Sequence, residues 1–167
     1  MKENPEVVYI VMGVTGSGKT TVGDALAARL GLPFYDGDTF HPPSNVEKMR
    51  FGIPLDDADR EPWLGTLAAK VSEWSGAGGA VLACSALKER YRRVLESRGR
   101  VRFIHLAPPK GRIVERLGRR KGHFMPPSLL DSQLEAMEPP ADAIRIESEG
   151  SVEENIAEIL AAIAARG

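Results

Sequence analysis

A glycine-rich segment near the start of the chain most constrains what this sequence can fold into. Residues 13–20 read G-V-T-G-S-G-K-T, and an uninterrupted apolar run at 7–12 directly precedes them. This is the pattern G-x-x-x-x-G-K-[ST], in which glycines let the backbone turn tightly between a buried strand and a helix. Val22, Leu26 and Leu30 continue with the spacing of an amphipathic helix. We therefore favour a strand, a phosphate-binding loop and a helix over a glycine-rich turn that binds nothing.

The chemistry of this loop follows from its hydrogen-bond donors. Its backbone N–H groups and the positive end of the following helix form a nest for a polyphosphate. Lys19 would reach the outer phosphates, and the Thr20 hydroxyl would ligate Mg²⁺. We expect a nucleoside triphosphate to bind here. The residues expected to hold it are Gly13, Thr15, Gly16, Ser17, Gly18, Lys19, Thr20 and Thr21.

The bulk composition argues against several classes of protein. The formal net charge is −1, so no overall positive field indicates nucleic acid or an anionic membrane as a partner. The single cysteine, Cys84, excludes an intrachain disulfide and fits a reducing compartment. The apolar run at 7–12 ends at Gly13, well short of the roughly 20 apolar residues that a membrane span needs. We expect a soluble cytoplasmic protein with one domain, residues 1–167.

Short apolar runs alternate with longer helical patterns along the rest of the chain. Continuous apolar runs are typical of parallel strands buried on both faces, and apolar residues spaced three and four apart are typical of helices. This alternation predicts an α/β fold in which helices cover both faces of a parallel sheet. Strands are expected at 7–12, 32–35, 80–84, 101–107 and 143–147.

Two proline-rich segments, about 37–63 and 118–142, are longer than simple connections between a strand and a helix. Loops of this length in a compact domain are usually functional. We expect the first to be a substrate-binding insertion and the second, beside a cluster of arginines, to be a mobile lid over the transferred phosphate. Arg116 and Arg120 lie four residues apart on one helix face and are the expected pair. An RNA- or membrane-binding patch is disfavoured because Phe124 is the one aromatic residue nearby.

Asp36 and Asp38 come directly after the strand expected at 32–35. In an open α/β sheet, ligands bind at the carboxyl ends of the strands, the edge that the phosphate-binding loop also occupies. Asp36 there can hold Mg²⁺-bound water, and Asp38 can orient or deprotonate an attacking hydroxyl. The alternative is an Asx-type turn, because D-G-D is also good turn chemistry. Beside a phosphate-binding loop we favour the functional interpretation.

Residues 84–88 read C-S-A-L-K and follow the third expected strand. Walker-type ATPases commonly carry an aspartate at this place, so its absence argues against a motor-like ATPase and leaves Mg²⁺ to Thr20 and Asp36. We expect Cys84 to be a small buried apolar residue rather than a reactive thiol. The basic residues after it are either the solvated face of a helix or, near its start, partners of an anionic substrate.

Taken together, these segments resemble the gluconate kinases (gluconokinases), small P-loop kinases related to shikimate and nucleoside monophosphate kinases. The resemblance covers almost the whole chain. Its most specific parts are H-P-x-x-N-x-x-K-M at 41–49 and C-S-A-L-K at 84–88, because the phosphate-binding loop alone would be generic. Further matching segments are D-G-D at 36–38, G-I-P-L at 52–55, D-x-D-R at 57–60, P-W-L at 62–64, G-H-F at 122–124 and S-Q-L at 132–134.

The resemblance implies ATP-dependent, Mg²⁺-dependent phosphorylation of D-gluconate at its 6-hydroxyl, commonly by a homodimer. It implies a three-layer fold with a five-stranded sheet in the order 2-3-1-4-5 and a mobile lid. Asp38 would touch the acceptor hydroxyl and act as the base, while Asp36 would support Mg²⁺. Lys19 and the lid residues Arg116 and Arg120 would serve ATP and the transfer. The residues expected to hold the acceptor are Asp38, His41, Lys48, Arg60, Ser85, Lys88, Arg92 and His123.

Two alternatives stay open at this point. One is a kinase for another small sugar acid or polyol on the same scaffold. The other belongs to a different class, a regulatory module that binds nucleotide without turnover. Both would keep the phosphate-binding loop, and they differ in what the acceptor residues do.

Overall fold

A five-stranded parallel sheet forms the centre of the protein. The structure is a computed structural model that describes residues 6–119 and 127–166. The strand order is β2-β3-β1-β4-β5, and every neighbouring pair is parallel. The predicted α/β fold and the order 2-3-1-4-5 are therefore confirmed. The strands are β1 (Val8–Met12), β2 (Phe34–Asp36), β3 (Ala80–Ala83), β4 (Val101–Leu106) and β5 (Ile144–Ile146).

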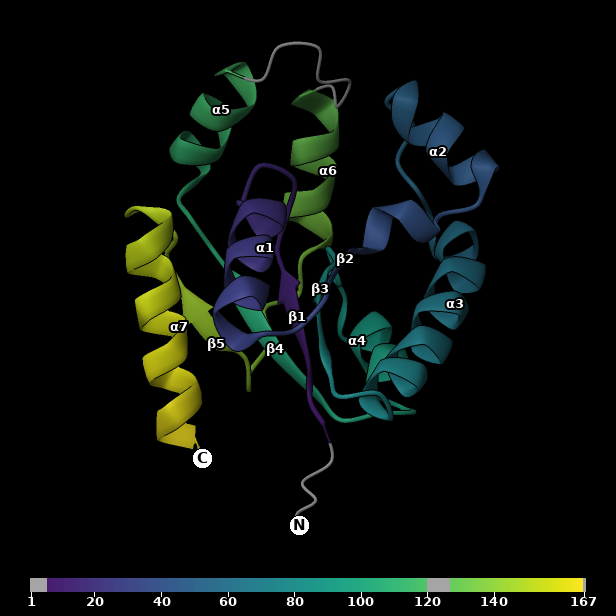
Figure 1. Ribbon diagram of the computed structural model, residues 1–167. Helices are drawn as coiled ribbons and strands as arrows, with labels where there is room; N and C mark the ends of the chain where they lie inside the picture. The colour runs from purple at the N-terminus through teal and green to yellow at the C-terminus, as the bar shows by residue number, and fades with distance from the viewer. Residues whose placement is uncertain (1–5, 120–126, 167) are drawn as a thin grey trace.

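Helices cover both faces of this sheet (Figure 1). Helices α1 and α7 pack over one face, and α3 and α4 pack over the other. Helices α5 and α6 stand near the end of the sheet at which β1 leads into α1, and α2 stands above α3. The helices are α1 (Lys19–Leu30), α2 (Pro43–Arg50), α3 (Asp57–Ser75), α4 (Glu89–Leu95), α5 (Lys110–Arg119), α6 (Pro127–Ala136) and α7 (Val152–Arg166), with a short 3₁₀ helix η1 (Gly37–Phe40).

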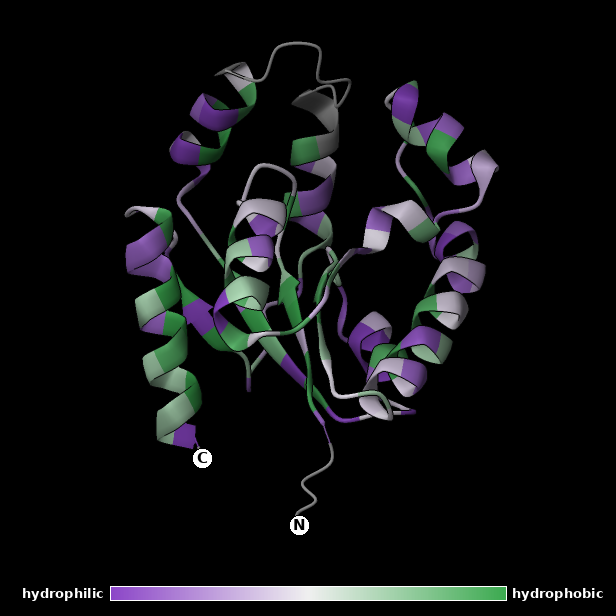
Figure 2. Cartoon of the chain, viewed as in Figure 1, coloured by the Kyte–Doolittle hydropathy of each residue, from purple (hydrophilic) through white to green (hydrophobic). Residues whose placement is uncertain are grey.

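Alternating side chains of the strands build two cores, one on each face of the sheet. In β1, Val8, Ile10 and Met12 belong to the core under α3 and α4, whereas Val11 belongs to the core under α1 and α7. All four are fully buried. Figure 2 shows β1 as hydrophobic and the surrounding helices as mixed in character. The continuous apolar run at 7–12 is what a strand covered on both faces requires.

A third, smaller core lies beside the phosphate-binding loop. Its buried residues are Val14 in that loop, Leu87 after β3, Ile113 in α5 and Leu130 in α6. Partly buried apolar side chains of α5 and α6 pack against it. This core holds α5 and α6 against the phosphate-binding loop, although the two helices lie far from that loop in the sequence.

The segment predicted as a substrate-binding insertion, 37–63, ends in a helix where a proline-rich loop was expected. Helix α3 begins at Asp57, and Pro62 lies inside it. A capping box starts the helix, because Asp56 and Asp59 each accept a hydrogen bond from the backbone N–H of the other. These bonds satisfy N–H groups of the first turn, and Trp63 is buried in the core. The helix therefore forms in spite of the proline.

Two adjacent glycines before β3 allow a matched test of how closely the chain packs there against the segment that leads into β1. Gly78 and Gly79 both have positive φ, +103° and +93°. A Cβ at Gly79 would lie 2.6 Å from the Val7 carbonyl oxygen, whereas a Cβ at Gly78 would meet nothing within 4 Å. We expect Gly78→Ala to lower the free energy of unfolding by about 1–2 kcal/mol through backbone strain, and Gly79→Ala by about 3 kcal/mol through strain and overlap. Urea denaturation measures both losses, and equal losses would contradict the packing argument.

Candidate active site

The glycine-rich loop turns the chain from β1 into α1 at the carboxyl edge of the sheet. Gly18 is the N-cap of α1 with φ +99°, and Gly16 has φ +78°. A Cβ at Gly16 would lie 2.8 Å from Ile113 Cγ2 of α5, so a larger residue there would push the loop and α5 apart. Because a glycine caps α1, no capping side chain covers the first N–H groups of the helix. The loop therefore has the geometry of an anion nest.

The side chains of the loop surround this nest. Lys19 is half-buried, and its Nζ donates a hydrogen bond to the Val14 carbonyl oxygen at 3.1 Å. Thr20 and Thr21 are exposed on the first turn of α1. The Thr15 N–H donates to Gln133 Oε1 of α6 at 2.6 Å. This last contact connects the loop to a helix for which the sequence indicated no such role.

Arg116 of α5 contacts backbone carbonyl oxygens of the phosphate-binding loop. Its Nη1 donates to the carbonyl oxygens of Gly16 and Ser17 at 3.4 and 3.1 Å, and its Nη2 donates to that of Ser148 at 2.5 Å. It also lines a hollow of about 280 Å³ beside the start of α1. We interpret this hollow as a place for the nucleoside part of a nucleotide. Its other lining residues are Gly18, Thr21, Val22, Ser148, Gly150, Val152 and Asn155.

Sequence reasoning missed Ser148 and Asn155 in this hollow. Ser148 is buried with φ +59°, and its Oγ donates to the Ser17 carbonyl oxygen at 3.3 Å. Asn155 is buried in α7 next to Ile156 of the core. A polar residue at the apolar stripe of the last helix was the available signal for Asn155, because a buried amide needs polar partners.

A second, small hollow of about 70 Å³ opens between the loop, η1, α3 and α6. Lys19, Asp38 and Arg60 meet there from separate parts of the sequence. Of the residues predicted to hold the acceptor, His41 and Ser85 line it as well. We call this space the acceptor hollow. Its other lining residues are Thr15, Met49, Ile53, Pro54, Leu55, Trp63, Ser132 and Gln133.

The carboxylates of Asp36 and Asp38 take different surroundings. Asp36 ends β2 and caps η1, because its Oδ1 accepts from the Asp38 N–H at 3.0 Å. The Asx-type turn is thus present, and it uses one carboxylate oxygen of Asp36. Burial raises the pKa of Asp36, and the neighbouring charge of Asp38 adds to this effect. The Asp38 side chain is 60% exposed and lines the acceptor hollow.

Gly37 fixes the backbone that carries these two carboxylates. A Cβ at this position would lie 2.8 Å from the Ala83 carbonyl oxygen of β3, so the turn fits closely against the sheet only with glycine. The Gly37 carbonyl oxygen accepts from Trp63 Nε1 of α3 at 2.8 Å. The turn is therefore held by both β3 and α3.

His41 lies beside Asp38 as a neutral side chain with a defined tautomer. Its ring stacks on Trp63 with 4.1 Å between centroids, and burial lowers its pKa to about 4. Asn45 Nδ2 donates to the Asp59 carbonyl oxygen at 2.8 Å and lies 3.1 Å from His41 Nδ1. Because an amide nitrogen donates and does not accept, Nδ1 is the acceptor and the ring proton is on Nε2. Nε2 lies 3.8 Å from Asp38 Oδ1.

Two of the cations predicted to hold the acceptor are paired with carboxylates. Lys48 Nζ donates to both carboxylate oxygens of Asp59 at 3.0 and 2.8 Å, and this bond raises the pKa of Lys48. A further hollow adjoins the acceptor hollow and shares Leu55, Arg60, Ser132 and Gln133 with it. Lys48 lines neither of these two hollows. Lys88 Nζ lies 3.3 Å from Asp57 Oδ1 in that adjoining hollow, which has a volume of about 190 Å³. Both lysines therefore stand near the site with much of their charge offset.

Arg60 differs from these lysines. Its Nη1 donates to two neutral oxygens, the Leu55 carbonyl at 2.6 Å and the Tyr91 hydroxyl at 3.3 Å. Within residues 6–119 and 127–166, no carboxylate forms an ion pair with it. It lines both the acceptor hollow and the adjoining one. Arg60 is thus the best placed cation for an anionic acceptor.

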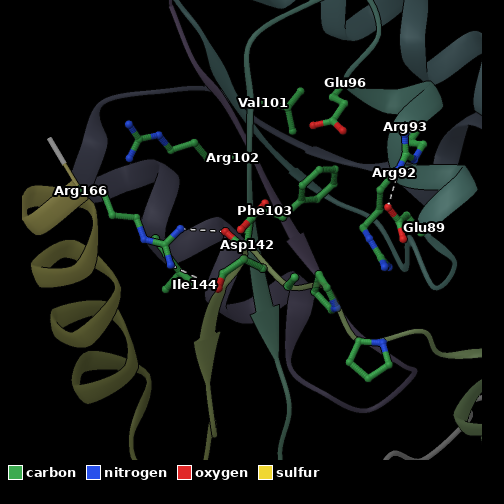
Figure 3. A pocket seen from close by; sticks show the side chains of 14 residues that line it. Glu89, Arg92, Arg93, Glu96, Val101, Arg102, Phe103, Asp142, Ile144 and Arg166 are labelled. Atoms are coloured by element: carbon green, nitrogen blue, oxygen red, sulfur yellow. Dashed lines mark hydrogen bonds and ion pairs between the residues drawn. The ribbon is translucent and has the colours of Figure 1, made fainter.

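Arg92, which we expected to bind the acceptor, is not brought to either hollow. It is 5% exposed, and its guanidinium donates to the carbonyl oxygens of Ala86, Leu87 and Glu138 at 2.7, 3.2 and 2.7 Å. It lines a different hollow of about 590 Å³, where it lies beside Arg93 and Glu89 of α4 (Figure 3). Tertiary contacts with backbone oxygens bury it, and its role here is structural.

The remaining predictions have mixed outcomes. Cys84 is fully buried, and burial raises its pKa to about 12, which confirms a small buried thiol rather than a reactive one. Arg120 and His123 lie outside the described residues. Among the residues that the structure describes, no helix has the length and apolar character to cross a membrane.

Comparison with known proteins identifies the family of this chain. Residues 15–163 match the family model of shikimate kinase. A gluconokinase of Gluconobacter oxydans is 52% identical over 145 residues, which are 84% of this chain and 82% of that relative. Among solved structures, a sugar kinase from Janibacter sp. has a TM-score of 0.89 at 42% identity, with 96% of this chain and 95% of that one covered. A gluconokinase from Sinorhizobium meliloti has a TM-score of 0.85 at 39% identity, with 98% and 94% covered. The chain therefore belongs to the gluconokinases, within the family that the shikimate kinase model describes.

Proposed function

We propose that this protein transfers the γ-phosphate of ATP to the 6-hydroxyl of D-gluconate, giving 6-phospho-D-gluconate and ADP. One observation carries the proposal: Lys19 of the phosphate-binding loop, the Asp38 carboxylate and the Arg60 guanidinium line the same hollow. A phosphate-binding group, a base and a cation are what a sugar-acid kinase needs in one place. The similarity to gluconokinases supports D-gluconate as the acid.

The transfer would be an in-line displacement at the γ-phosphorus. The 6-hydroxyl oxygen forms a bond to phosphorus, its proton goes to Asp38, and the bond to the bridging oxygen of ADP breaks. Lys19 and the N–H groups of the loop offset the charge on the phosphoryl oxygens. His41 is neutral, so its Nε2 proton can orient Asp38 or a polyol hydroxyl without repelling Arg60. Positioning by these groups supplies much of the rate.

Two oxygen donors of this chain suit Mg²⁺. The Thr20 hydroxyl and the Asp36 carboxylate are hard ligands of the kind that Mg²⁺ prefers. The described residues contain no group of three or more His, Cys, Asp or Glu side chains that could hold a metal ion. Water and ATP phosphates would therefore complete the shell, and the ion would neutralise phosphate charge when bound.

The other expectations belong to the same proposal. Residues 1–167 would form one kinase domain, with substrate bound by the insertion at about 37–63 and with a lid at about 118–142. Arg116 would hold ATP from α5, and Arg120 would join it in the transfer. The composition favours the cytoplasm, and the resemblance further implies a homodimer. Light scattering would measure the mass of that dimer directly.

An acceptor panel tests the proposed function. We expect Mg²⁺-dependent formation of ADP with D-gluconate, and less than a tenth of its kcat/KM with other aldonates, shikimate or nucleoside monophosphates. Preference for a different sugar acid would support the alternative kinase on the same scaffold. Nucleotide binding with no turnover on any acceptor would support the regulatory module.

Asp38→Asn tests the base. This variant keeps the size of the side chain and removes its ability to accept the proton, so kcat should fall by about 10²- to 10⁴-fold. Affinity for ATP, measured by calorimetry, should stay within about threefold because Asp38 lies on the acceptor side. A variant that retains its kcat would remove Asp38 from the chemical step.

Arg60→Met tests the cation for the acceptor carboxylate. We expect KM for D-gluconate to rise about 10- to 100-fold, the size of a lost charged hydrogen bond. The preference for gluconate over uncharged glucitol should shrink by a similar factor. Lys48→Met is the matched control, because Lys48 is paired with Asp59 and lines neither hollow. Equal effects of the two substitutions on this preference would contradict the assignment.

A further inference from the structure

Gln133 of α6 lies where the donor and acceptor sites meet. Its Oε1 accepts a hydrogen bond from the Thr15 N–H in the phosphate-binding loop at 2.6 Å, across 118 residues of sequence. The same side chain lines the acceptor hollow with Lys19 and Asp38, and it lines the adjoining hollow with Arg60. Figure 1 shows α6 close to the loop that leads into α1. One neutral side chain is therefore shared by the loop and both hollows.

The contact with Thr15 uses a donor that the loop needs for phosphate. An anion nest binds through its backbone N–H groups, and one N–H makes one strong hydrogen bond. A phosphate oxygen carries charge and makes a stronger bond to N–H than a neutral amide oxygen does. Phosphate entering the loop at Thr15 would therefore displace Gln133 Oε1.

The rest of α6 is held in place while this exchange occurs. Leu130 is buried in the small core with Val14 and Leu87. Glu138, just beyond the helix, donates its N–H to the Leu87 carbonyl oxygen at 2.8 Å, and its own carbonyl oxygen accepts from Arg92. The displaced group is thus the Gln133 side chain rather than the helix.

We propose that Gln133 couples phosphate binding in the loop to acceptor binding in the hollow. Without phosphate, its Oε1 is held by Thr15. With phosphate in the loop, the freed amide turns into the acceptor hollow, where its two N–H donors and one oxygen can bond to polyol hydroxyls. The inference rests on the proposed kinase function, because a polyol must be the occupant of that hollow.

A consequence follows by thermodynamic linkage. If phosphate frees Gln133 for the acceptor, then nucleotide strengthens acceptor binding, and acceptor strengthens nucleotide binding by the same factor. Coupling between sites is typically about 5- to 150-fold. Most of this factor should depend on the Gln133 amide.

Two substitutions separate the parts of this mechanism. Gln133→Met keeps the length of the side chain and its packing but removes the amide. Gln133→Glu puts a charged acceptor against the Thr15 N–H, where it competes with phosphate and repels it. Glu135→Gln, an exposed position on the same helix, is the matched control for a change between amide and carboxylate. Equal melting temperatures within about 3 °C would show that all three variants are folded.

Calorimetry with a non-hydrolysable ATP analogue, with and without D-gluconate, gives the coupling factor. We expect Gln133→Met to bind the analogue alone more tightly than the unsubstituted protein, by up to the coupling factor, because no amide oxygen then competes for the Thr15 N–H. It should also reduce the coupling factor towards one and raise KM for gluconate about tenfold. Gln133→Glu should weaken binding of the analogue at least tenfold in the absence of acceptor. Glu135→Gln should change none of these quantities.

The outcomes distinguish this inference from the proposed function. If Gln133→Met keeps both the coupling factor and KM, the inference is wrong even though gluconate is the acceptor. If the unsubstituted protein does not phosphorylate gluconate, the proposed function fails, and analogue binding by Gln133→Glu still tests the Thr15 contact. Should Gln133→Met not fold, Gln133→Asn takes its place, because it keeps the amide but is too short to reach both sites.

Discussion

Parallel pairing of the strands is the constraint on which the whole site depends. Because β1 pairs in parallel with both β3 and β4, and β2 with β3, the chain leaves these strands at the same edge of the sheet. The phosphate-binding loop after β1 therefore lies beside the segments that follow β2 and β3. One hydrogen bond joins two of them directly, from the Gly13 N–H to the Ser85 carbonyl oxygen at 3.3 Å. Donor and acceptor groups meet because the strand order brings three loops together.

Charge pairing at the start of α3 decides which cations face the acceptor. Asp59 completes the capping box and also holds Lys48, while Asp57 accepts hydrogen bonds from Tyr91 and Lys88. Arg60, next along the chain, has neutral oxygens as its partners. The first residues of α3 thus cap the helix and offset the charges of Lys48 and Lys88. They also place the Arg60 guanidinium beside neutral partners. A guanidinium with neutral partners suits a substrate with one carboxylate and several hydroxyls, because specificity for a small acid needs few charges and many hydrogen bonds.

Sequence reasoning succeeded where the signal was local. The phosphate-binding loop and the D-G-D turn are contiguous motifs, and the five strands are short apolar runs, so each could be placed without knowing its neighbours. It failed where contacts between distant parts of the chain determine what a side chain does. A basic residue in a helix does not reveal whether it meets a ligand or backbone carbonyls, and Arg92 meets carbonyls. Asn45 likewise acts through burial, which its own sequence position does not disclose.

The structural role of Arg92 still bears on the site. Its guanidinium supports the carbonyl oxygen of Ala86, a residue with φ +47° next to Ser85 of the acceptor hollow. It also fastens Glu138, whose carboxylate accepts from the Glu89 N–H at the start of α4. Bonds at Glu138 therefore tie the far end of α6 to α4 and to the loop after β3. Because that end is held by these bonds, they help to set the position of Gln133 relative to Thr15. Arg92 thus serves the acceptor from outside its hollow, through the helix and the loop that line it.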